Sequence, residues 1–140
     1  MPIAQKKELL KEIKNRCIKK SKEYKKRYKR LKKWDDRIDL LVSFLNSANI
    51  ACLISGLTYP PILIASIVCS GLGLIVSRVQ QSYNFKHRYT THNNTINNYN
   101  EVAREIITIL HRNHLTNEQL QEYIEYINSK LDIIEGSSIL

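Results

Sequence analysis

Residues 40–77 read LLVSFLNSANIACLISGLTYPPILIASIVCSGLGLIVS, and this run decides the fold of the 140-residue chain. It contains no Lys, Arg, Asp, Glu or His, whereas charged residues are dense on both sides of it. Gly56 and the pair Pro60-Pro61 interrupt the run near its middle. A helix needs roughly 20 apolar residues to cross the hydrocarbon core of a bilayer, with a lower limit of about 17. The pattern therefore predicts a two-span transmembrane hairpin over residues 39–78, with its turn at 57–61.

The two arms of this predicted hairpin differ in length. The first, residues 40–57, is long enough to span, but the second, residues 62–76, falls short of the limit. We therefore expect a thinned bilayer or an oligomer that shields the mismatch. Two alternatives remain open. The run could be a hydrophobic hairpin buried inside a soluble helical bundle, because short apolar runs are more often core helices, or a hairpin that dips into one leaflet only.

Charge is distributed unevenly along the chain, whose formal net charge is +9. Residues 1–37 carry 16 Lys and Arg against 5 Asp and Glu, whereas residues 78–140 carry 6 against 7. No apolar run lies at the N-terminus, so we expect no cleaved signal peptide and an insertion directed by the first arm. Basic residues flank both outer ends of the apolar run, and the positive-inside rule then predicts that both termini are cytoplasmic.

Residues 1–38 predict one long basic amphipathic helix, because they contain no Gly, have Pro only at position 2, and are rich in good helix formers. A thin coiled-coil seam recurs every seven residues at Leu10, Cys17, Tyr24, Leu31 and Ile38. The seam is too polar for a strong autonomous coiled coil. We expect it to dock on another helix of this protein or of a neighbouring subunit.

The basic helix contains the sequence KKSKEYKKRYKRLKK at residues 19–33. A polybasic segment beside a membrane span is attracted to anionic lipid by about 1 kcal/mol per charge near the surface. We expect such headgroup and topology roles here. There are two alternatives: the helix binds nucleic acid through phosphate contacts, or its charged face is only solvated. We regard nucleic acid as the less favoured partner. The candidate headgroup or topology residues are Lys25, Lys26, Arg27, Lys29, Arg30, Lys32, Lys33, Arg37 and Arg78.

Small residues line one face of each apolar arm, and such faces let helix backbones approach closely in lipid. The candidate helix-packing residues are Ser43, Ser47, Ala51 and Ser55 in the first arm and Ser66, Ser70, Gly73 and Ser77 in the second. These faces predict a tightly packed hairpin and self-association. Asn46 and Asn49 are polar residues within the first arm. They are either hydrogen-bonded between helices or exposed to a wet interior formed by oligomerisation.

Residues 79–140 predict a two-helix cytoplasmic segment that folds as an antiparallel helical hairpin. The first helix begins near Gln80 and its apolar stripe is His92, Ile96, Tyr99, Ala103, Ile106 and Leu110. The Asn cluster around Asn93 favours a break. Thr116 and Gln119 match a capping box that starts the second helix. The stripe of that helix is Leu120, Ile124, Ile127, Leu131 and Ile134.

The sequence contains no clear pattern for a metal site, a catalytic group or a disulfide framework. His111 and His114 have no further ligand at suitable spacing, so we expect no metal site. The serines of the arms lack a nearby base, so nucleophilic catalysis is not expected. The odd cysteine count, with Cys52 and Cys69 inside the arms, does not describe a disulfide framework. Cys17 is expected to be a buried free thiol, with palmitoylation or oxidation as the alternative. We therefore expect no enzyme and no cofactor.

Three segments carry a resemblance to a known class of proteins. These are YKKRYKRLKKWDDRIDLLVSFLNSAN at 24–49, HNNTINNYN at 92–100 and LTNEQLQEYIEYIN at 115–128, with the Gly- and Ser-containing hairpin between the first two. Their order resembles the two-transmembrane-helix proteins of viruses and of Maverick/Polinton-type virus-like elements, and more distantly the SLATT domains of prokaryotic defence systems. The resemblance implies a two-span membrane protein. SLATT-type domains are proposed to be pore-forming membrane effectors, but the chain lacks a nucleotide-sensing partner module.

Taken together, these features predict an all-α, non-enzymatic integral membrane protein that self-associates through its hairpin. A viral or mobile-element origin is favoured, with the protein in a host or virion membrane that it permeabilises or remodels. The expected partners are anionic lipid headgroups, further copies of the chain and a protein bound to the cytoplasmic helices. The alternatives are a SLATT-like pore, an anchor or scaffold that recruits a capsid or other partner, and a soluble helical protein that binds nucleic acid.

Overall fold

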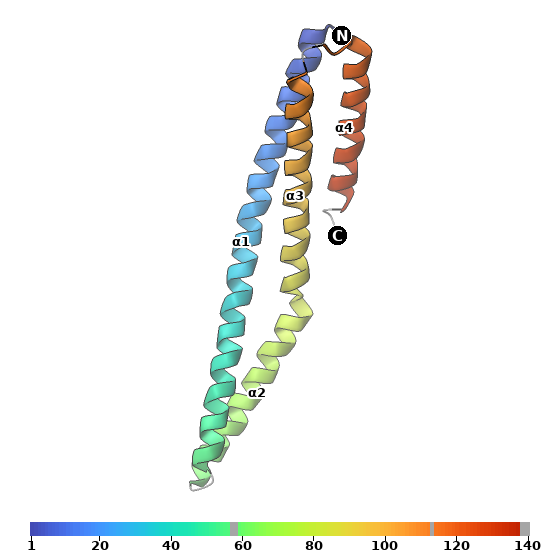
Figure 1. Cartoon of the computed structure of the whole chain (residues 1–140). Helices are drawn as coiled ribbons and strands as arrows, with labels where there is room; N and C mark the ends of the chain where they lie inside the picture. The colour runs from blue at the N-terminus through green and yellow to red at the C-terminus, as the bar shows by residue number, and fades with distance from the viewer. Residues whose placement is uncertain (57–58, 113, 138–140) are drawn as a thin grey trace. The chain divides into compact units, whose positions relative to one another are not determined.

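The computed structural model describes residues 1–56, 59–112 and 114–137. Its elements are four α-helices: α1 (Ile3–Gly56), α2 (Pro60–Tyr83), α3 (Phe85–Leu110) and α4 (Asn117–Ser137) (Figure 1). No strand occurs among the described residues, which confirms the all-α prediction. Leu57 and Thr58, in the predicted turn, lie outside the described part of the chain.

The first helix, α1, is longer than any element expected from the sequence. It runs for 54 residues, so the predicted basic helix and the first apolar arm are one uninterrupted element. The reason is local, because the chain contains neither Gly nor Pro between Ile3 and Ser55 and nothing there disfavours helix.

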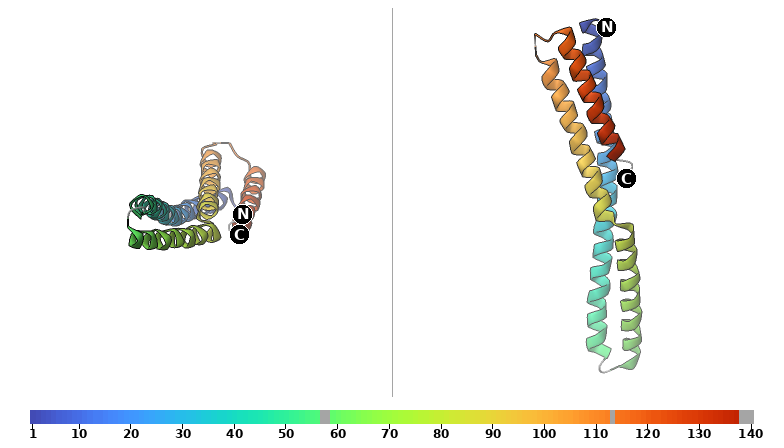
Figure 2. Two further views of the ribbon diagram at one scale, coloured as in Figure 1. Left: turned by 90° about the horizontal axis from the view of Figure 1, so that it is seen from below. Right: turned by 90° about the vertical axis from the view of Figure 1, so that its right-hand side faces the viewer.

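The chain divides into two compact units, both of which contain part of α1. We call residues 1–28 and 90–140 the bundle unit and residues 29–89 the apolar unit. In the bundle unit, α1, α3 and α4 run side by side (Figures 1 and 2). In the apolar unit, the C-terminal half of α1 lies beside α2 in the same views.

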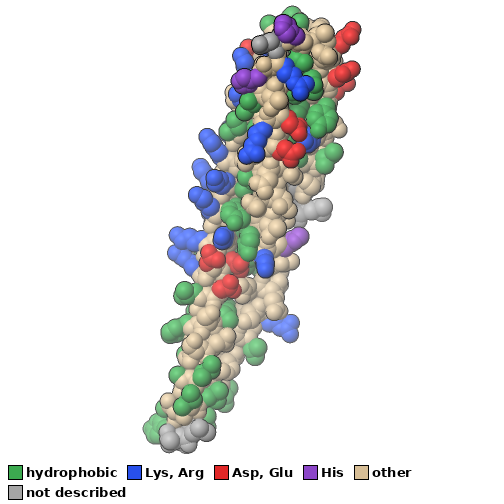
Figure 3. All heavy atoms as spheres, viewed as in Figure 1, with side chains coloured by type: hydrophobic (Ala, Val, Ile, Leu, Met, Phe, Trp, Pro, Cys, Tyr) green, Lys and Arg blue, Asp and Glu red, His purple; other side chains and the backbone are tan. Residues whose placement is uncertain are grey.

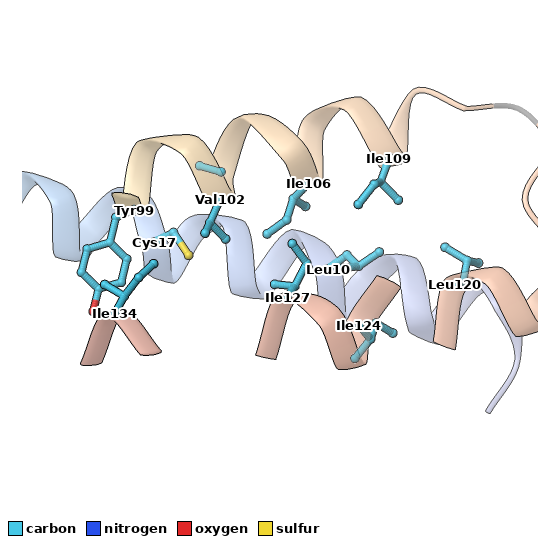
Figure 4. Packing of buried hydrophobic residues seen from close by; sticks show 11 residues of the cluster. Leu10, Cys17, Tyr99, Val102, Ile106, Ile109, Leu120, Ile124, Ile127 and Ile134 are labelled. Carbon is cyan, nitrogen blue, oxygen red and sulfur yellow. The ribbon is translucent and has the colours of Figure 1, made fainter. Parts of the chain in front are cut away.

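The core of the bundle unit is built from apolar stripes on three helices (Figure 4). Leu10 and Cys17 of α1 are almost fully buried, and the predicted stripes of α3 and α4 face them. The structure therefore confirms the two C-terminal stripes and shows that the N-terminal seam docks within the same protein. The buried members are Leu10, Cys17, Tyr99, Val102, Ala103, Ile106, Ile109, Leu120, Ile124, Ile127 and Ile134.

The start of α4 has the capping geometry that its sequence predicts. The backbone N–H of Thr116 donates to Gln119 Oε1 at 3.1 Å, and the backbone N–H of Gln119 donates to Thr116 Oγ1 at 3.3 Å. This reciprocal pair satisfies two N–H groups that the helix itself cannot bond. Leu120, directly behind the cap, is fully buried, so the cap fixes where α4 enters the core.

Ion pairs fasten α4 to its neighbours in the bundle unit. Lys130 donates to Glu105 Oε1 at 2.6 Å and to Glu101 Oε1 at 2.9 Å, and both carboxylates raise the pKa of Lys130. Glu135 accepts from Lys20 of α1. That hydrogen bond lowers the pKa of Glu135 and raises the pKa of Lys20, so the pair is ionised at neutral pH.

The break between α2 and α3 falls at Asn84, and the expected break near Asn93 is wrong. Asn84 has φ 47° and ψ 49°, and its N–H caps the carbonyls of Gln80 and Gln81. Asparagine tolerates this left-handed conformation better than most residues. At the Asn cluster, α3 continues because Ile96 and Tyr99 are buried, and tertiary packing outweighs low helix propensity.

Candidate membrane-spanning site

The surface of the apolar unit is formed by large hydrophobic side chains. Ile67 is 72% exposed and Leu40 is 74% exposed, and Figure 3 shows such green side chains over the end of the molecule that carries the α1–α2 turn. Exposed apolar patches of this extent are rare on soluble monomers. The exposed members are Leu40, Leu41, Phe44, Ile50, Leu53, Ile54, Leu63, Ile64, Ile67, Val68, Leu72, Leu74, Ile75 and Val79.

Two helical stretches are long and apolar enough to cross a membrane by length and composition. They lie within residues Ile3–Ser55 and Pro61–Leu110, and their most apolar windows are 0% and 11% buried. A core helix of a soluble protein would pass the same test of length and composition, but most of it would be buried. Little of either window is buried within the described part of the chain.

One face of α1 in the apolar unit is turned toward α2. Its half-buried positions recur every three or four residues and include Val42, Leu45, Asn49 and Cys52. Asn49 lies on this face and accepts a hydrogen bond from Ser66 of α2, which fixes the face as the contact surface. The predicted small residues of α2 lie on the opposing side of this contact, because Ser66 and Gly73 are buried and Ser70 and Ser77 are half-buried.

The small-residue stripe of the first arm is not part of the α1–α2 contact. Ser43, Ser47, Ala51 and Ser55 are all exposed. At 3.6 residues per turn they lie on roughly the opposite side of α1 from Val42, Leu45, Asn49 and Cys52. The expectation that two small faces pack together within one hairpin is therefore wrong for the first arm. Larger side chains make that contact, while the stripe remains on the surface.

The two asparagines of the first arm have different environments. Asn49 is half-buried and accepts a hydrogen bond from Ser66, which is 3% exposed. Asn49 therefore fits the interhelical alternative. Asn46 is exposed at the edge of the contact, with Oδ1 3.8 Å from the position a Cβ on Gly73 would take. Asn46 is thus the polar side chain that needs a partner from outside the monomer or from water.

Neither Gly71 nor Gly73 of α2 makes a contact that would exclude an added Cβ. A Cβ built on Gly71 would meet nothing within 4 Å, and one on Gly73 would make an ordinary contact with Asn46. Neither glycine is required for a close backbone approach. Gly71 therefore makes no close contact with the described residues that would require the absence of a side chain.

A polar and aromatic layer lies at the end of the apolar unit that is remote from the turn. Gln80 of α2 donates to Asp35 Oδ1 at 3.1 Å and to Asp39 Oδ1 at 2.5 Å. Arg37 lies over the exposed Trp34 ring, 5.8 Å from its centroid. The Gln80 hydrogen bonds join the C-terminal part of α2 to the stretch of α1 that directly precedes the apolar run. Sequence reasoning missed the Gln80 bridge, although Asp35 and Asp39 at i and i+4 share one helix face.

The opposite end of the apolar unit carries Tyr59, which is exposed immediately before α2. Tyr and Trp favour membrane interfaces, where one end of the ring is apolar and the other wet. Trp34 and Tyr59 therefore bracket the apolar surface along α1 and α2.

All nine candidate headgroup or topology residues, from Lys25 to Arg37 and Arg78, have exposed side chains. None of them makes an ion pair with the residues that the structure describes. Arg27 lies over the Tyr24 ring at 5.5 Å, in addition to the Arg37 contact with Trp34. The described residues therefore do not neutralise this positive charge through ion pairs.

The histidines and cysteines considered for metal binding or reactivity have structural roles where the structure describes their contacts. Within residues 1–56, 59–112 and 114–137, no three His, Cys, Asp or Glu side chains are placed to hold a metal ion. His111 Nδ1 lies 2.7 Å from the Ile107 carbonyl and acts as a local cap. Burial raises the pKa of the Cys17 thiol, so this cysteine is a protonated core residue, as expected for a small hydrophobe.

Comparison with known proteins gives no relative: no family model, curated protein or solved structure matches the chain. The geometry of the two units is therefore the basis for assigning a function.

Proposed function

We propose that this chain is a non-enzymatic integral membrane protein whose apolar unit crosses a bilayer twice. The single observation that carries the proposal is the uncovered apolar surface of residues 40–79. In the apolar unit the polar Ser66 is buried while Ile67 and Leu74 are exposed. This is the reverse of the bundle unit, where Leu10 and Ile106 are buried. Polar groups inside and apolar groups outside are the arrangement that hydrocarbon solvent favours.

The lengths of the two arms fit a bilayer. Residues 40–56 of α1 rise about 25 Å, and residues 60–77 of α2 about 27 Å, at 1.5 Å per residue. The hydrocarbon core is about 30 Å thick, and a few Å less in the thinner cellular membranes. The second arm gains Pro60 and Pro61 at its start, where the missing N–H groups cost nothing. The mismatch is then small enough for modest thinning.

The exposed cations support a topology with both termini in the cytoplasm. Lys32, Lys33 and Arg37 stand just before the first arm, and Arg78 directly follows the second. Unpaired Lys and Arg near the ends of spans set orientation. The cations nearest the apolar surface then lie among the headgroups, where their long side chains reach the phosphates.

Self-association is proposed to use the first-arm stripe. Ser43, Ser47, Ala51 and Ser55 are exposed on α1, opposite the contact with α2, so a second copy can reach them. Small residues and polar side chains support helix association in lipid, where apolar burial gives no driving force. The nearby exposed Asn46 would gain a partner in such an oligomer.

Two roles follow for the oligomer, a pore or an anchor. The Ser66–Asn49 hydrogen bond favours the anchor, because the Asn49 side chain is bonded to Ser66 and does not line a water-filled interior. Liposome leakage separates the two. If Asn46→Leu with Asn49→Leu leaves leakage unchanged, the pore role is lost and the anchor role stands. Leakage that depends on both asparagines would support a permeabilising protein.

The sequence resemblance supports a viral or mobile-element setting for this membrane protein. In that setting the bundle unit, on the cytoplasmic side, is the part available to a capsid component or another protein partner. Co-purification of a stoichiometric partner with the detergent-solubilised protein would test the recruiting role, and its loss on deletion of α4 would place the partner on the bundle unit.

Extraction of membranes is the direct test of the proposal. Cell membranes that contain the full-length protein are washed with high salt, then with alkaline carbonate, and then treated with a non-ionic detergent. We expect release by detergent only, because the spans bury their apolar surface in lipid. Release by salt alone would refute the membrane assignment and support a soluble, nucleic-acid-binding protein. Release by carbonate but not salt would indicate a hairpin that enters one leaflet.

A further inference from the structure

The outward face of α1 in the bundle unit carries a compact group of lysines with no function in the fold. The group is Lys19, Lys22, Lys25 and Lys26, and all four side chains are exposed. None of them makes an ion pair or a cation–π contact with a described residue. We call these four residues the lysine face.

The lysine face lies opposite the buried side of the same helix. At about 100° per residue, the four lysines fall within an arc of about 120°, while Cys17 and Tyr24 occupy the other side. Cys17 is buried in the core, and Tyr24 is stacked on Tyr99 with centroids 6.0 Å apart. Figure 3 shows blue side chains along this edge of α1. The lysine face therefore points away from the core over two turns of helix.

The lysine face is separated along α1 from the apolar run of the proposed function. Lys26 is 14 residues from Leu40, the first residue of the apolar run, which is about 21 Å along the axis of α1. The headgroup layer extends only about 5–8 Å beyond the hydrocarbon. Beyond it, attraction to anionic lipid decays over a Debye length of about 8 Å. Along α1, Lys32, Lys33 and Arg37 lie within or close to this range of the apolar run, whereas the lysine face, which includes the predicted headgroup residues Lys25 and Lys26, lies beyond it.

We infer that the lysine face binds the phosphate backbone of a nucleic-acid duplex, holding it beside the membrane. This inference rests on the proposed function and takes up nucleic acid, which the sequence left as the less favoured partner. A protein interface needs an apolar centre, but the lysine face consists of cations alone. Phosphates are bound by charge without further contacts. Lys is suited to that task because its ammonium group is a mobile point charge.

A duplex is favoured over a single strand because the lysine face has no ring on which a base could stack. Tyr24, the aromatic residue between the four lysines, is directed inward against Tyr99 and His92. Binding of single strands depends on such stacking platforms. The expected binding is therefore independent of sequence and strongly dependent on salt.

The test uses the full-length protein in phosphatidylcholine nanodiscs and a fluorescein-labelled RNA duplex of random sequence. Four phosphate contacts at a slope of about −0.9 each give about a hundred-fold loss of affinity between 50 and 200 mM salt. Replacement of the lysine face by glutamine (K19Q/K22Q/K25Q/K26Q) should weaken binding at least ten-fold at low salt and reduce the slope by about 3–4. The control, R104Q/R112Q, removes two exposed charges in and directly after α3, which belong neither to the lysine face nor to the residues proposed to set topology, and should change the slope by less than about 1.

Three outcomes would overturn the inference. Equal losses in the two variants would mean that net charge, not the lysine face, attracts the duplex. An unchanged slope in the lysine-face variant would place binding elsewhere. A loss of binding to phosphatidylserine vesicles in the lysine-face variant, without any duplex binding by the native protein, would assign the face to a membrane. Nanodisc incorporation is scored separately by size exclusion, so failure of the membrane assignment is distinguished from failure of duplex binding.

Discussion

A lysine placed at the centre of α2 tests whether the exposed apolar surface faces lipid or water. Ile67 lies near the middle of the second arm and is 72% exposed. On insertion scales an Ile at a span centre contributes about −0.3 to −0.6 kcal/mol and a Lys about +2.5 to +3.5. Ile67→Lys should therefore disfavour insertion of α2 by about 3–4 kcal/mol. If Ile67 faces water instead, the same substitution should change the free energy of unfolding by no more than about 0.5 kcal/mol.

The effect is large compared with what holds α2 in the bilayer. Residues 62–76 contain nine Ile, Leu and Val, which together favour insertion by about 3–5 kcal/mol before the cost of the serines and glycines is subtracted. One lysine should bring the equilibrium close to balance. We expect roughly half of the chains to leave α2 outside the membrane, and these chains carry their C-terminal part across to the lumenal side.

The chain contains its own reporter for this translocation. Asn93-Asn94-Thr95 matches the N-glycosylation acceptor pattern, and it should stay unmodified when both termini are cytoplasmic. Translation of Ile67→Lys with microsomes should give a glycosylated fraction that an endoglycosidase removes. The control Ile107→Lys replaces an exposed isoleucine of the bundle unit and should remain unmodified. An Ile67→Lys chain that integrates fully and stays unmodified would refute lipid exposure at this position.

Three further predictions concern packing and ion pairing within the two units. Ile106 is fully buried and Ile107 is 40% exposed. In denaturant unfolding of the bundle unit, Ile106→Ala should lower the free energy of unfolding by about 2–5 kcal/mol. Ile107→Ala should lower it by less than about 1 kcal/mol. The hydrogen bond from Lys20 lowers the pKa of Glu135, so the ion pair stabilises the fold above the unfolded-state pKa. This stabilisation is lost as pH falls through the folded-state pKa. Glu135→Gln should therefore unfold at a lower temperature than the native chain at pH 7, but at the same temperature at strongly acidic pH. Gly73→Ala should leave the association of α1 and α2 unchanged within about 0.5 kcal/mol, as followed by energy transfer between labels on the two helices, because its Cβ would make only an ordinary contact.

The helical stripes were predictable because burial on a helix follows its period. The stripes of α3 and α4 are apolar against a polar background, so the spacing of residues such as Ile106 and Leu120 identifies the core side directly. The same is true of the cap at Thr116, where the pairing with Gln119 is local in sequence. Features that depend on a few neighbouring residues could thus be read from the chain.

The contact face of the first arm could not be predicted in the same way. Residues 40–56 are uncharged on every side, so hydrophobic periodicity gives no contrast. The rhythm of Ser43, Ser47 and Ala51 then suggested a packing face, although α2 lies on the other side. The choice between faces is made by shape and by the Ser66–Asn49 hydrogen bond, which joins residues 17 apart and leaves no local signature. The extent of α1 was also unexpected, because composition changes at residue 38 but helix propensity does not.

The heptad seam of α1 explains how one helix serves two environments. Its positions continue in phase from Leu10, Cys17 and Tyr24 through Leu31 and Ile38 to Leu45 and Cys52, and every one is buried or half-buried. The inward face therefore keeps a single period along the helix. Only the outward face changes, from lysines at residues 19–33 to exposed Leu, Phe and Ile at residues 40–54. The partner helices change from α3 and α4 to α2, yet the seam stays in phase, and the residue types differ only on the outer face, as a change of solvent would require. The unbroken seam thus supports passage of α1 from water into lipid.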